Sequence, residues 1–230
     1  MIIFTDDKKN LGASDLVDKI LPNFAQLSYD PIAIDLPQFG HAPPISLENS
    51  AEIKAPIAFI KQILIHLNIK SASSTVVFTG EAGHYMIPFI QDQPHFFQAI
   101  LGIDPKHEII SSLDLNKKSL FQKRISSILA PFWVFWTPET TQIDLEKELF
   151  AGIATGGNFM IDFDEKVLEK PIGARHSWIF EDQDQFLRIF KEFDDFVEET
   201  NSDQRSYLKS LEDLPGQVVI QNATAEELKV

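Results

Sequence analysis

The chain has 230 residues, 44% of them hydrophobic, which is enough for one sizeable core and predicts a single main domain. Thirty-four acidic residues against twenty basic ones give a net charge of −14. Nucleic acids and anionic membrane surfaces bind positive charge, so this balance argues against either as a partner. The sequence contains no cysteine, which excludes disulfides, thiolate catalysis and cysteine-ligated metals.

The apolar runs argue against secretion and membrane insertion. The run after Met1 covers only residues 2–4, which is too short for the core of a signal peptide. No later run approaches the roughly eighteen apolar residues that a membrane-spanning helix needs. Together with the lack of cysteine, these features predict a cytoplasmic protein.

Short apolar runs alternate along the chain with segments of helical periodicity. The strand-like runs lie at 2–4, 32–37, 76–79, 97–103, 132–136, 159–163 and 167–172, and the helical patterns lie at 14–24, 50–68, 114–128 and 186–197. Strands that are apolar on both faces and alternate with amphipathic helices are typical of a parallel sheet covered on both sides. We therefore expect an α/β protein, a three-layer sandwich with a mostly parallel central sheet and helices on both faces.

The last part of the chain differs in composition. Residues 1–199 are predicted to form the α/β domain, and residues 200–230 a C-terminal extension. Within the extension, "QVVIQ" at 217–221 is strand-like, so this segment is either one added strand or part of a loosely held tail.

One strand and the loop after it carry a family motif. The stretch "IAIDLPQFGHAPP", residues 32–44, is similar to the segment that members of the α/β-hydrolase superfamily carry before their first long helix, apolar-apolar-Asp-Leu-Pro-Gly-x-Gly-x-Ser. Asp35, Leu36, Pro37 and Gly40 match, whereas Gln38 and Ala42 replace the first glycine and the serine. The other predicted elements follow in the order of that superfamily over residues 2–199, and the chain is therefore identified as a member.

The resemblance implies a reduced version of the fold. Family members normally begin with an antiparallel strand pair, and they often carry a cap domain between the strands that 97–103 and 132–136 resemble. Here the chain starts at the third strand, and the segment between those two strands has room for about one helix of ordinary length. We expect a fold that lacks the first strands and most of the cap.

The resemblance also implies a catalytic histidine and an acid that orients it. His176, in "GARHSW" before the last helix, lies where the family places its histidine. For the acid, Glu139 after the strand at 132–136 is the first candidate, followed by Asp104 and then Asp144. The alternative for each of these side chains is an ordinary, solvated loop position.

The nucleophile is where the family pattern is not matched. Members carry it in G-x-S-x-G, at the tip of a strained turn between a strand and a helix. In "VVFTGEAGHYMIPF", residues 76–89, one register puts Ala82 at the tip and His84 in place of the second glycine, and another puts Glu81 at the tip. Neither supplies a serine. Glu81 is longer than the aspartates that act as nucleophiles in some members, which favours a role as base or ligand contact.

The backbone donors for an oxyanion are altered as well. Family members have His-Gly where this chain has Thr5 and Asp6, and the aspartate places negative charge where negative charge would develop. Thr5, Asp6 and His84 are therefore expected to be substrate-binding residues of a changed site.

These departures predict a hydrolase-like protein whose non-standard site binds or acts on a small molecule without a serine nucleophile. The alternatives are a non-catalytic ligand- or protein-binding module and a serine esterase whose serine comes from elsewhere, such as "SASS" at 71–74. The six histidines lack the spacing of metal ligands, so no metal or cofactor is expected. A second copy of the chain is a candidate partner at an open sheet edge.

Overall fold

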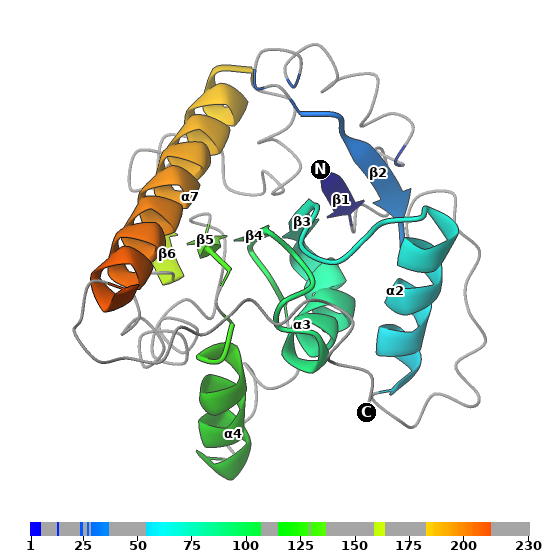
Figure 1. Cartoon of the computed structure of the whole chain (residues 1–230). Helices are drawn as coiled ribbons and strands as arrows, with labels where there is room; N and C mark the ends of the chain where they lie inside the picture. Colours follow the sequence, from blue (N-terminus) through cyan, green and yellow to red (C-terminus); the bar gives the residue numbers. More distant parts are fainter. Residues whose placement is uncertain are drawn as a thin grey trace.

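The computed structural model describes residues 1–5, 13, 24, 27, 29–36, 54–106, 115–128, 130–136, 159–163 and 183–212. The centre of this part of the chain is a six-stranded parallel sheet with helices on both faces (Figure 1). The predicted α/β class and three-layer arrangement are confirmed.

The sheet follows the predicted apolar runs. Its strands are β1 (Ile2–Thr5), β2 (Ile32–Asp35), β3 (Thr75–Thr79), β4 (Ala99–Ile103), β5 (Phe132–Trp136) and β6 (Phe159–Phe163). Their order is β2-β1-β3-β4-β5-β6, and every neighbouring pair is parallel. Among the described residues, no antiparallel strand pairs with β2. The predicted strand at 167–172 lies outside the described residues.

The central strands bury both of their faces, which explains why they read as unbroken apolar runs. Side chains alternate along a strand, so successive residues face opposite sides of the sheet. Val76 and Phe78 of β3 pack in one apolar cluster, and Val77 between them packs in the other. Leu101 and Trp133 join the second cluster, while Ile100 and Phe132 beside them join the first.

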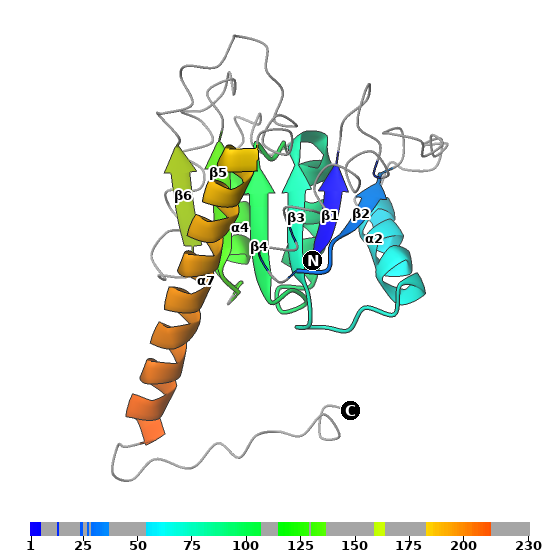
Figure 2. The same cartoon turned by 90° about the horizontal axis from the view of Figure 1, so that it is seen from above.

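The described helices divide between the two faces (Figures 1 and 2). One face is covered by α2 (Lys54–His66), α3 (Gly83–Asp92) and α4 (Leu115–Ile125), and the other by α7 (Gln183–Glu212). In the described part of the segment between β4 and β5, α4 is the one helix, which agrees with the expected loss of most of the cap. Ala13, just before the predicted helix at 14–24, and Phe24, its last residue, are both helical.

An aromatic stripe attaches α7 to the sheet. Phe190 packs edge-on against Phe24 with ring centroids 5.2 Å apart, and Phe193 stacks on Trp133 at 6.1 Å. All four rings are fully buried. Aromatic pairs at such distances contribute about 0.5–1.5 kcal/mol each beyond the burial of their area.

The predicted domain boundary at residue 199 falls inside α7. The helix continues without interruption to Glu212, and its C-terminal part extends beyond the sheet (Figure 2). The predicted strand at 217–221 lies outside the described residues.

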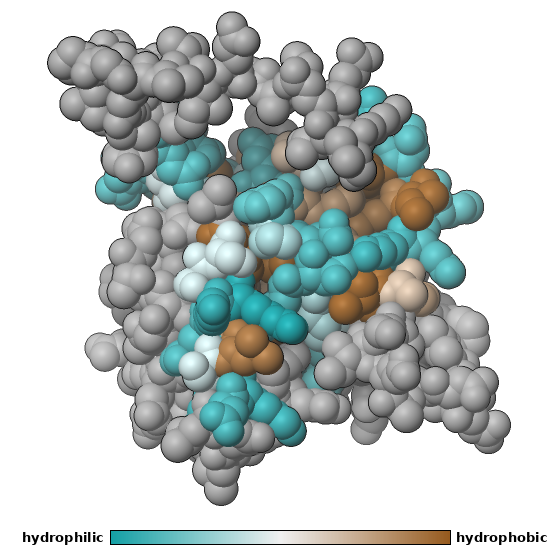
Figure 3. Space-filling model, turned by 60° about the horizontal axis from the view of Figure 1, so that its bottom comes forward, coloured by the Kyte–Doolittle hydropathy of each residue, from teal (hydrophilic) through white to brown (hydrophobic). Residues whose placement is uncertain are grey.

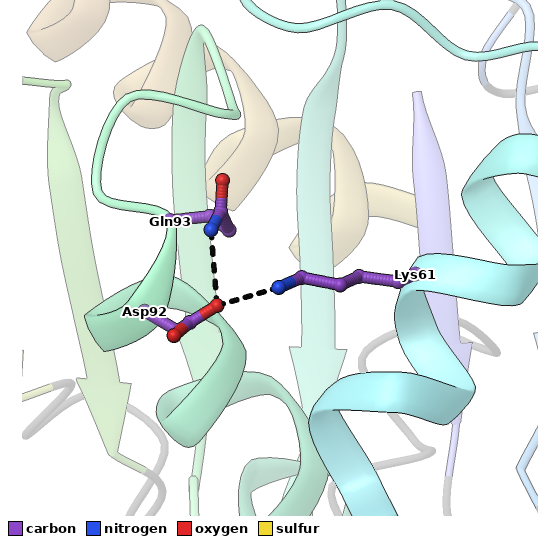
Figure 4. A network of polar contacts seen from close by, with 3 residues as sticks. All are labelled: Lys61, Asp92 and Gln93. Atoms are coloured by element: carbon purple, nitrogen blue, oxygen red, sulfur yellow. Dashed lines mark hydrogen bonds and ion pairs between the residues drawn. The ribbon is translucent and has the colours of Figure 1, made fainter. Parts of the chain in front are cut away.

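A polar contact ties α2 to the C-terminus of α3 (Figure 4). Asp92, the last residue of α3, accepts hydrogen bonds from Lys61 Nζ at 2.8 Å and from Gln93 Nε2 at 3.0 Å. Both hydrogen bonds lower the pKa of the Asp92 carboxyl, and the bond from Lys61 has the larger effect. A carboxylate is unfavourable at the C-terminus of a helix, and the Lys61 ammonium offsets its charge. Because the two side chains are 44% and 42% exposed, their pairing adds little to stability.

The exposed apolar side chains are spread over the surface. Among the described residues, the large hydrophobic side chains with the most exposure are Ile32, Ile65, Leu67 and Leu120. The face in Figure 3 shows apolar patches interrupted by hydrophilic side chains. None of the described helices combines the length and the apolar character that crossing a bilayer requires.

A polar network joins α7 to the amino end of β3. The Tyr29 hydroxyl donates a hydrogen bond to Asp194 Oδ1 of α7, and it also hydrogen-bonds the Thr75 side chain. Burial, followed by the bond to Asp194, raises the pKa of the Tyr29 hydroxyl. Burial likewise raises the pKa of the Asp194 carboxyl; the Tyr29 bond lowers it, and the charges of Asp195 and Glu198 raise it further. The ionised form of Asp194 is therefore disfavoured in the folded protein.

Asp194→Asn should become more stable than wild type as the pH rises. The folded-state pKa of Asp194 lies above its ordinary value of 3.8. Between those two values the folded protein holds a proton that the unfolded chain has lost, so wild-type stability falls as the pH rises through the folded-state pKa. Asparagine keeps an acceptor for Tyr29 and does not titrate. Urea unfolding at a series of pH values, starting near 3.8, should show a difference that grows with pH and then levels off.

Asp203→Asn, at an exposed position on the same helix, is the matched control. It corrects for the loss of one negative charge from an acidic protein. A difference between Asp194→Asn and wild type that stays constant, or shrinks as the pH rises, contradicts the prediction.

Candidate functional site

The chain passes from β3 to α3 through one tight turn. β3 ends at Thr79, a 3-10 turn (η2) covers Gly80–Ala82, and α3 begins at Gly83. Gly80 has a φ of 44°, in the left-handed region. That region costs a residue with a side chain about 1–2 kcal/mol, and glycine adopts it freely. The sharp reversal therefore lies at Gly80, which adopts this conformation without the penalty that a side chain would bring.

This residue is neither of the two that the sequence registers put at the tip of the turn. Glu81 follows it, and Ala82 is fully buried with a right-handed φ of −60°. In the register with Ala82 at the tip, Gly80 is the small flanking residue. In the register with Glu81 at the tip, the small flanking residues are Thr79 and Gly83, and Gly80 lies between Thr79 and the tip. In the structure, the left-handed conformation falls on Gly80 itself.

Backbone contacts hold the turn against the end of β4. Thr79 and Ile103, the last residues of β3 and β4, pair with each other in the sheet. The next residues, Gly80 and Asp104, therefore leave the sheet side by side. Asp104 is also left-handed, with a φ of 46°. The Lys106 N–H donates to the Gly80 carbonyl at 2.9 Å, and a Cβ placed on Gly83 would be 2.4 Å from the Lys106 carbonyl oxygen. The two chain reversals thus pack backbone to backbone at the carboxyl edge of the sheet.

Three charged or titratable side chains meet beside this turn. Glu81 Oε1 accepts a hydrogen bond from Lys106 Nζ at 2.8 Å, and Glu81 Oε2 lies 3.1 Å from His84 Nε2. Glu81 and His84 are 34% and 35% exposed, and Lys106 is 59% exposed. Two predicted site residues, Glu81 and His84, are therefore brought together. Lys106, which follows β4 beside the turn, is not among the predicted site residues.

Within the part of the chain that the structure describes, no group of three or more histidine and carboxylate side chains is arranged to hold a metal ion.

The fold is that of known enzymes. No protein-family model matches the sequence, and no curated protein sequence matches it either. Solved structures do resemble it. A predicted CIB-like hydrolase from Thermoplasma acidophilum has a TM-score of 0.59 and 19% identity, with 84% of each chain covered. A carboxylesterase structure from Nitrososphaera gargenis has a TM-score of 0.56 and 12% identity, with 88% of this chain and 91% of that chain covered. The carboxylesterase CesB from Bacillus subtilis has a TM-score of 0.58 and 10% identity, with coverages of 84% and 82%. The chain has the α/β-hydrolase fold.

In the α/β-hydrolase fold, a strained turn between a strand and a helix carries the nucleophile at its tip. The turn between β3 and α3 lies at the corresponding place between a strand and a helix, and its left-handed residue is Gly80. The backbone N–H of the next residue, Glu81 here, is the one that serves as an oxyanion donor in active members of the fold. The turn therefore has the backbone reversal of such an elbow, and the residue in the left-handed conformation is a glycine.

The α/β-hydrolase topology also brings the ends of β1 and β2 to this edge. Thr5, a predicted substrate-binding residue, ends β1 and pairs with Asp35 at the end of β2. Asp35 Oδ1 accepts a hydrogen bond from the backbone N–H of Ala13 at 2.8 Å, so the aspartate of the "DLP" motif binds a helical segment. The predicted residues Asp6, Glu139, Asp144 and His176 lie outside the described residues.

The serines at 71–74 lie at the opposite edge of the sheet. They precede the amino end of β3, whereas the elbow follows its carboxyl end. The hydroxyl of Ser71 donates to the His95 carbonyl at 3.3 Å, and that of Ser73 donates to the Lys70 carbonyl at 2.6 Å. This segment therefore does not supply a serine to the elbow.

Gly83→Ala should destabilise the protein by about 1–3 kcal/mol, the usual cost of forcing a methyl group into a packed site. The added Cβ would meet the Lys106 backbone at 2.4 Å, and backbone atoms cannot rotate away. Helix propensity alone would stabilise this variant, because alanine is favoured over glycine in a helix by about 1 kcal/mol. A loss of stability would therefore come from the contact with Lys106. Urea unfolding gives the measurement.

Gly102→Ala in β4 is the matched control. Its Cβ would meet Phe78 ring atoms at 3.1 Å and 3.3 Å, contacts that a small movement of a side chain can relieve. We expect a smaller loss for this variant. A Gly83→Ala protein as stable as wild type would show that the turn is not docked on Lys106 as described.

Proposed function

We propose that this protein binds and acts on a small molecule at the carboxyl edge of its sheet, without forming a covalent serine intermediate. The observation that carries the proposal is the left-handed Gly80 at the elbow, because the residue in the nucleophile position has no side chain to attack with. Open α/β sheets bind their ligands at this edge. Structural neighbours named as hydrolases and carboxylesterases support a small organic molecule as the ligand.

The proposed base is His176, oriented by Glu139 or by Asp104. Asp104 supports this arrangement by its position, since it follows β4 directly beside Gly80. Thr5, at the end of β1, and Asp6 after it are proposed to contact the ligand.

A non-catalytic binding module is the second candidate, and the ion pairs of Glu81 favour it. Both carboxylate oxygens already have a partner, Lys106 on one and His84 on the other. Glu81 then serves to hold the turn against the β4 loop, and the scaffold binds a ligand or a protein without converting it.

A fluorophosphonate probe should not label any serine near the elbow of the wild-type protein, but it should label Gly80→Ser. That substitution places a hydroxyl at the strained position, at a conformational cost of about 1–2 kcal/mol. Ala82→Ser, the matched control, puts the hydroxyl at a fully buried position and should remain unlabelled. Mass spectrometry of the labelled proteins locates the modified residue, and thermal unfolding verifies that each variant is folded.

His176→Ala in the Gly80→Ser background should abolish the labelling, because the serine then lacks a base. Labelling of a wild-type serine beside the elbow would contradict the proposed function. Labelling of Ala82→Ser in place of Gly80→Ser would contradict the position of the tip, and labelling that survives the loss of His176 would remove that histidine from the site.

A further inference from the structure

The face that α4 turns to solvent is basic. The helix contains no acidic residue and four basic ones, Lys117, Lys118, Lys123 and Arg124. Phe121 and Ile125 are buried and attach the helix to the core, whereas Leu120 is 51% exposed. Lys117, Lys123 and Arg124 are all exposed and stand three or four residues from Leu120, so they surround it on the helix surface. In a chain with a net charge of −14, α4 thus presents one apolar side chain among cations.

The exposed face of α7 carries the opposite charge. Between residues 192 and 204 this helix contains no basic residue. The exposed acidic residues of that stretch are Glu192, Asp195, Glu198, Glu199 and Asp203. Phe196 is partly buried against the core, and Glu192 and Glu199 flank it at spacings of four and three residues. The acidic face of α7 therefore also has an apolar side chain among its charges.

The basic face of α4 and the acidic face of α7 are complementary, but they cannot meet within one molecule. α4 packs on one side of the sheet and α7 on the other, and the two helices are well separated in Figure 1. A second copy of the chain can bring its α7 to α4. Such a contact joins two different surfaces, so each copy keeps one more face for a further copy.

We propose that the basic face of α4 binds the acidic face of α7 of a second copy, with Leu120 against the partner's Phe196. This contact does not depend on the proposed function. A contact between single helices is smaller than the interface of a stable dimer, so the association should be weak and should grow with protein concentration.

Salt should act on this contact in a defined way. At an ionic strength of about 0.15 M, the Debye length is about 8 Å, so the long-range repulsion between two acidic chains is largely screened, while ion pairs in direct contact persist. At about 1 M the Debye length falls to about 3 Å, and the ion pairs weaken as well. Sedimentation velocity over a series of protein concentrations should show dimers and larger species at the lower ionic strength and fewer of them at the higher one.

Two charge reversals test the two faces separately. Lys123→Glu and Glu199→Lys should each weaken the association on the order of tenfold, because each replaces an attraction across the contact with a repulsion. Lys123 is preferred to Arg124, whose charge also acts on the Asp92 carboxyl. Glu199→Lys makes the chain less negative, so a general loss of repulsion would strengthen the association, whereas the proposed contact predicts the opposite.

Lys70→Glu, at an exposed position between α2 and β3, is the matched control for Lys123→Glu and should associate like wild type. Thermal unfolding verifies that each variant is folded.

A mixture of the two variants is the sharpest test. Lys123→Glu keeps the acidic face of α7, and Glu199→Lys keeps the basic face of α4. The mixture should therefore recover association that neither variant shows alone. A symmetric contact, in which one surface meets its own copy, would not be restored in this way.

Wild-type protein that stays monomeric up to about 1 mM would overturn the proposal, and an acidic segment of another protein would then be the better occupant of α4. Association that survives either reversal, or that Lys70→Glu weakens equally, would overturn it too. A mixture that fails to recover association would show that the two faces do not meet.

Discussion

The backbone packing between the turn after β3 and the turn after β4 is the constraint on which the site depends. The Gly80 carbonyl accepts the Lys106 N–H at 2.9 Å, and Gly83 approaches Lys106 too closely to tolerate a side chain. α3 therefore starts at one place and in one direction. Glu81 and His84, three residues apart at that start, are presented together beside Lys106. The same few backbone atoms hold the fold and build the site.

Much of the fold follows from the sequence because parallel strands bury both faces. Val76, Val77 and Phe78 form an unbroken apolar run, and successive residues of it enter opposite apolar clusters. α3 does not follow in the same way. Six of its ten residues are buried and Pro88 lies inside it, so it lacks the polar face that reveals an amphipathic helix. The sequence also does not predict that α7 continues past residue 199. The last turns of this helix are too polar to extend its apolar stripe.

The candidate site follows from the sequence only in part. The order of elements brings Glu81 and His84 to the correct edge of the sheet. The residue at the tip of the elbow cannot be predicted from the sequence. A glycine in the motif is either a small flanking residue or the left-handed residue, and only the backbone angle distinguishes the two. Lys106 does not follow either. It is 25 residues from Glu81 in the chain, and the two become neighbours only through the pairing of β3 with β4.

Gly80 holds the left-handed position in the turn between β3 and α3, and the proposed function depends on that assignment. The most direct test is a crystal structure of the wild-type protein that resolves the backbone of residues 79–83. The account predicts a left-handed φ at Gly80, a right-handed φ at Ala82, and the Lys106 N–H on the Gly80 carbonyl. A left-handed φ at Glu81 or Ala82 would contradict it, because that residue would then be the tip of the elbow.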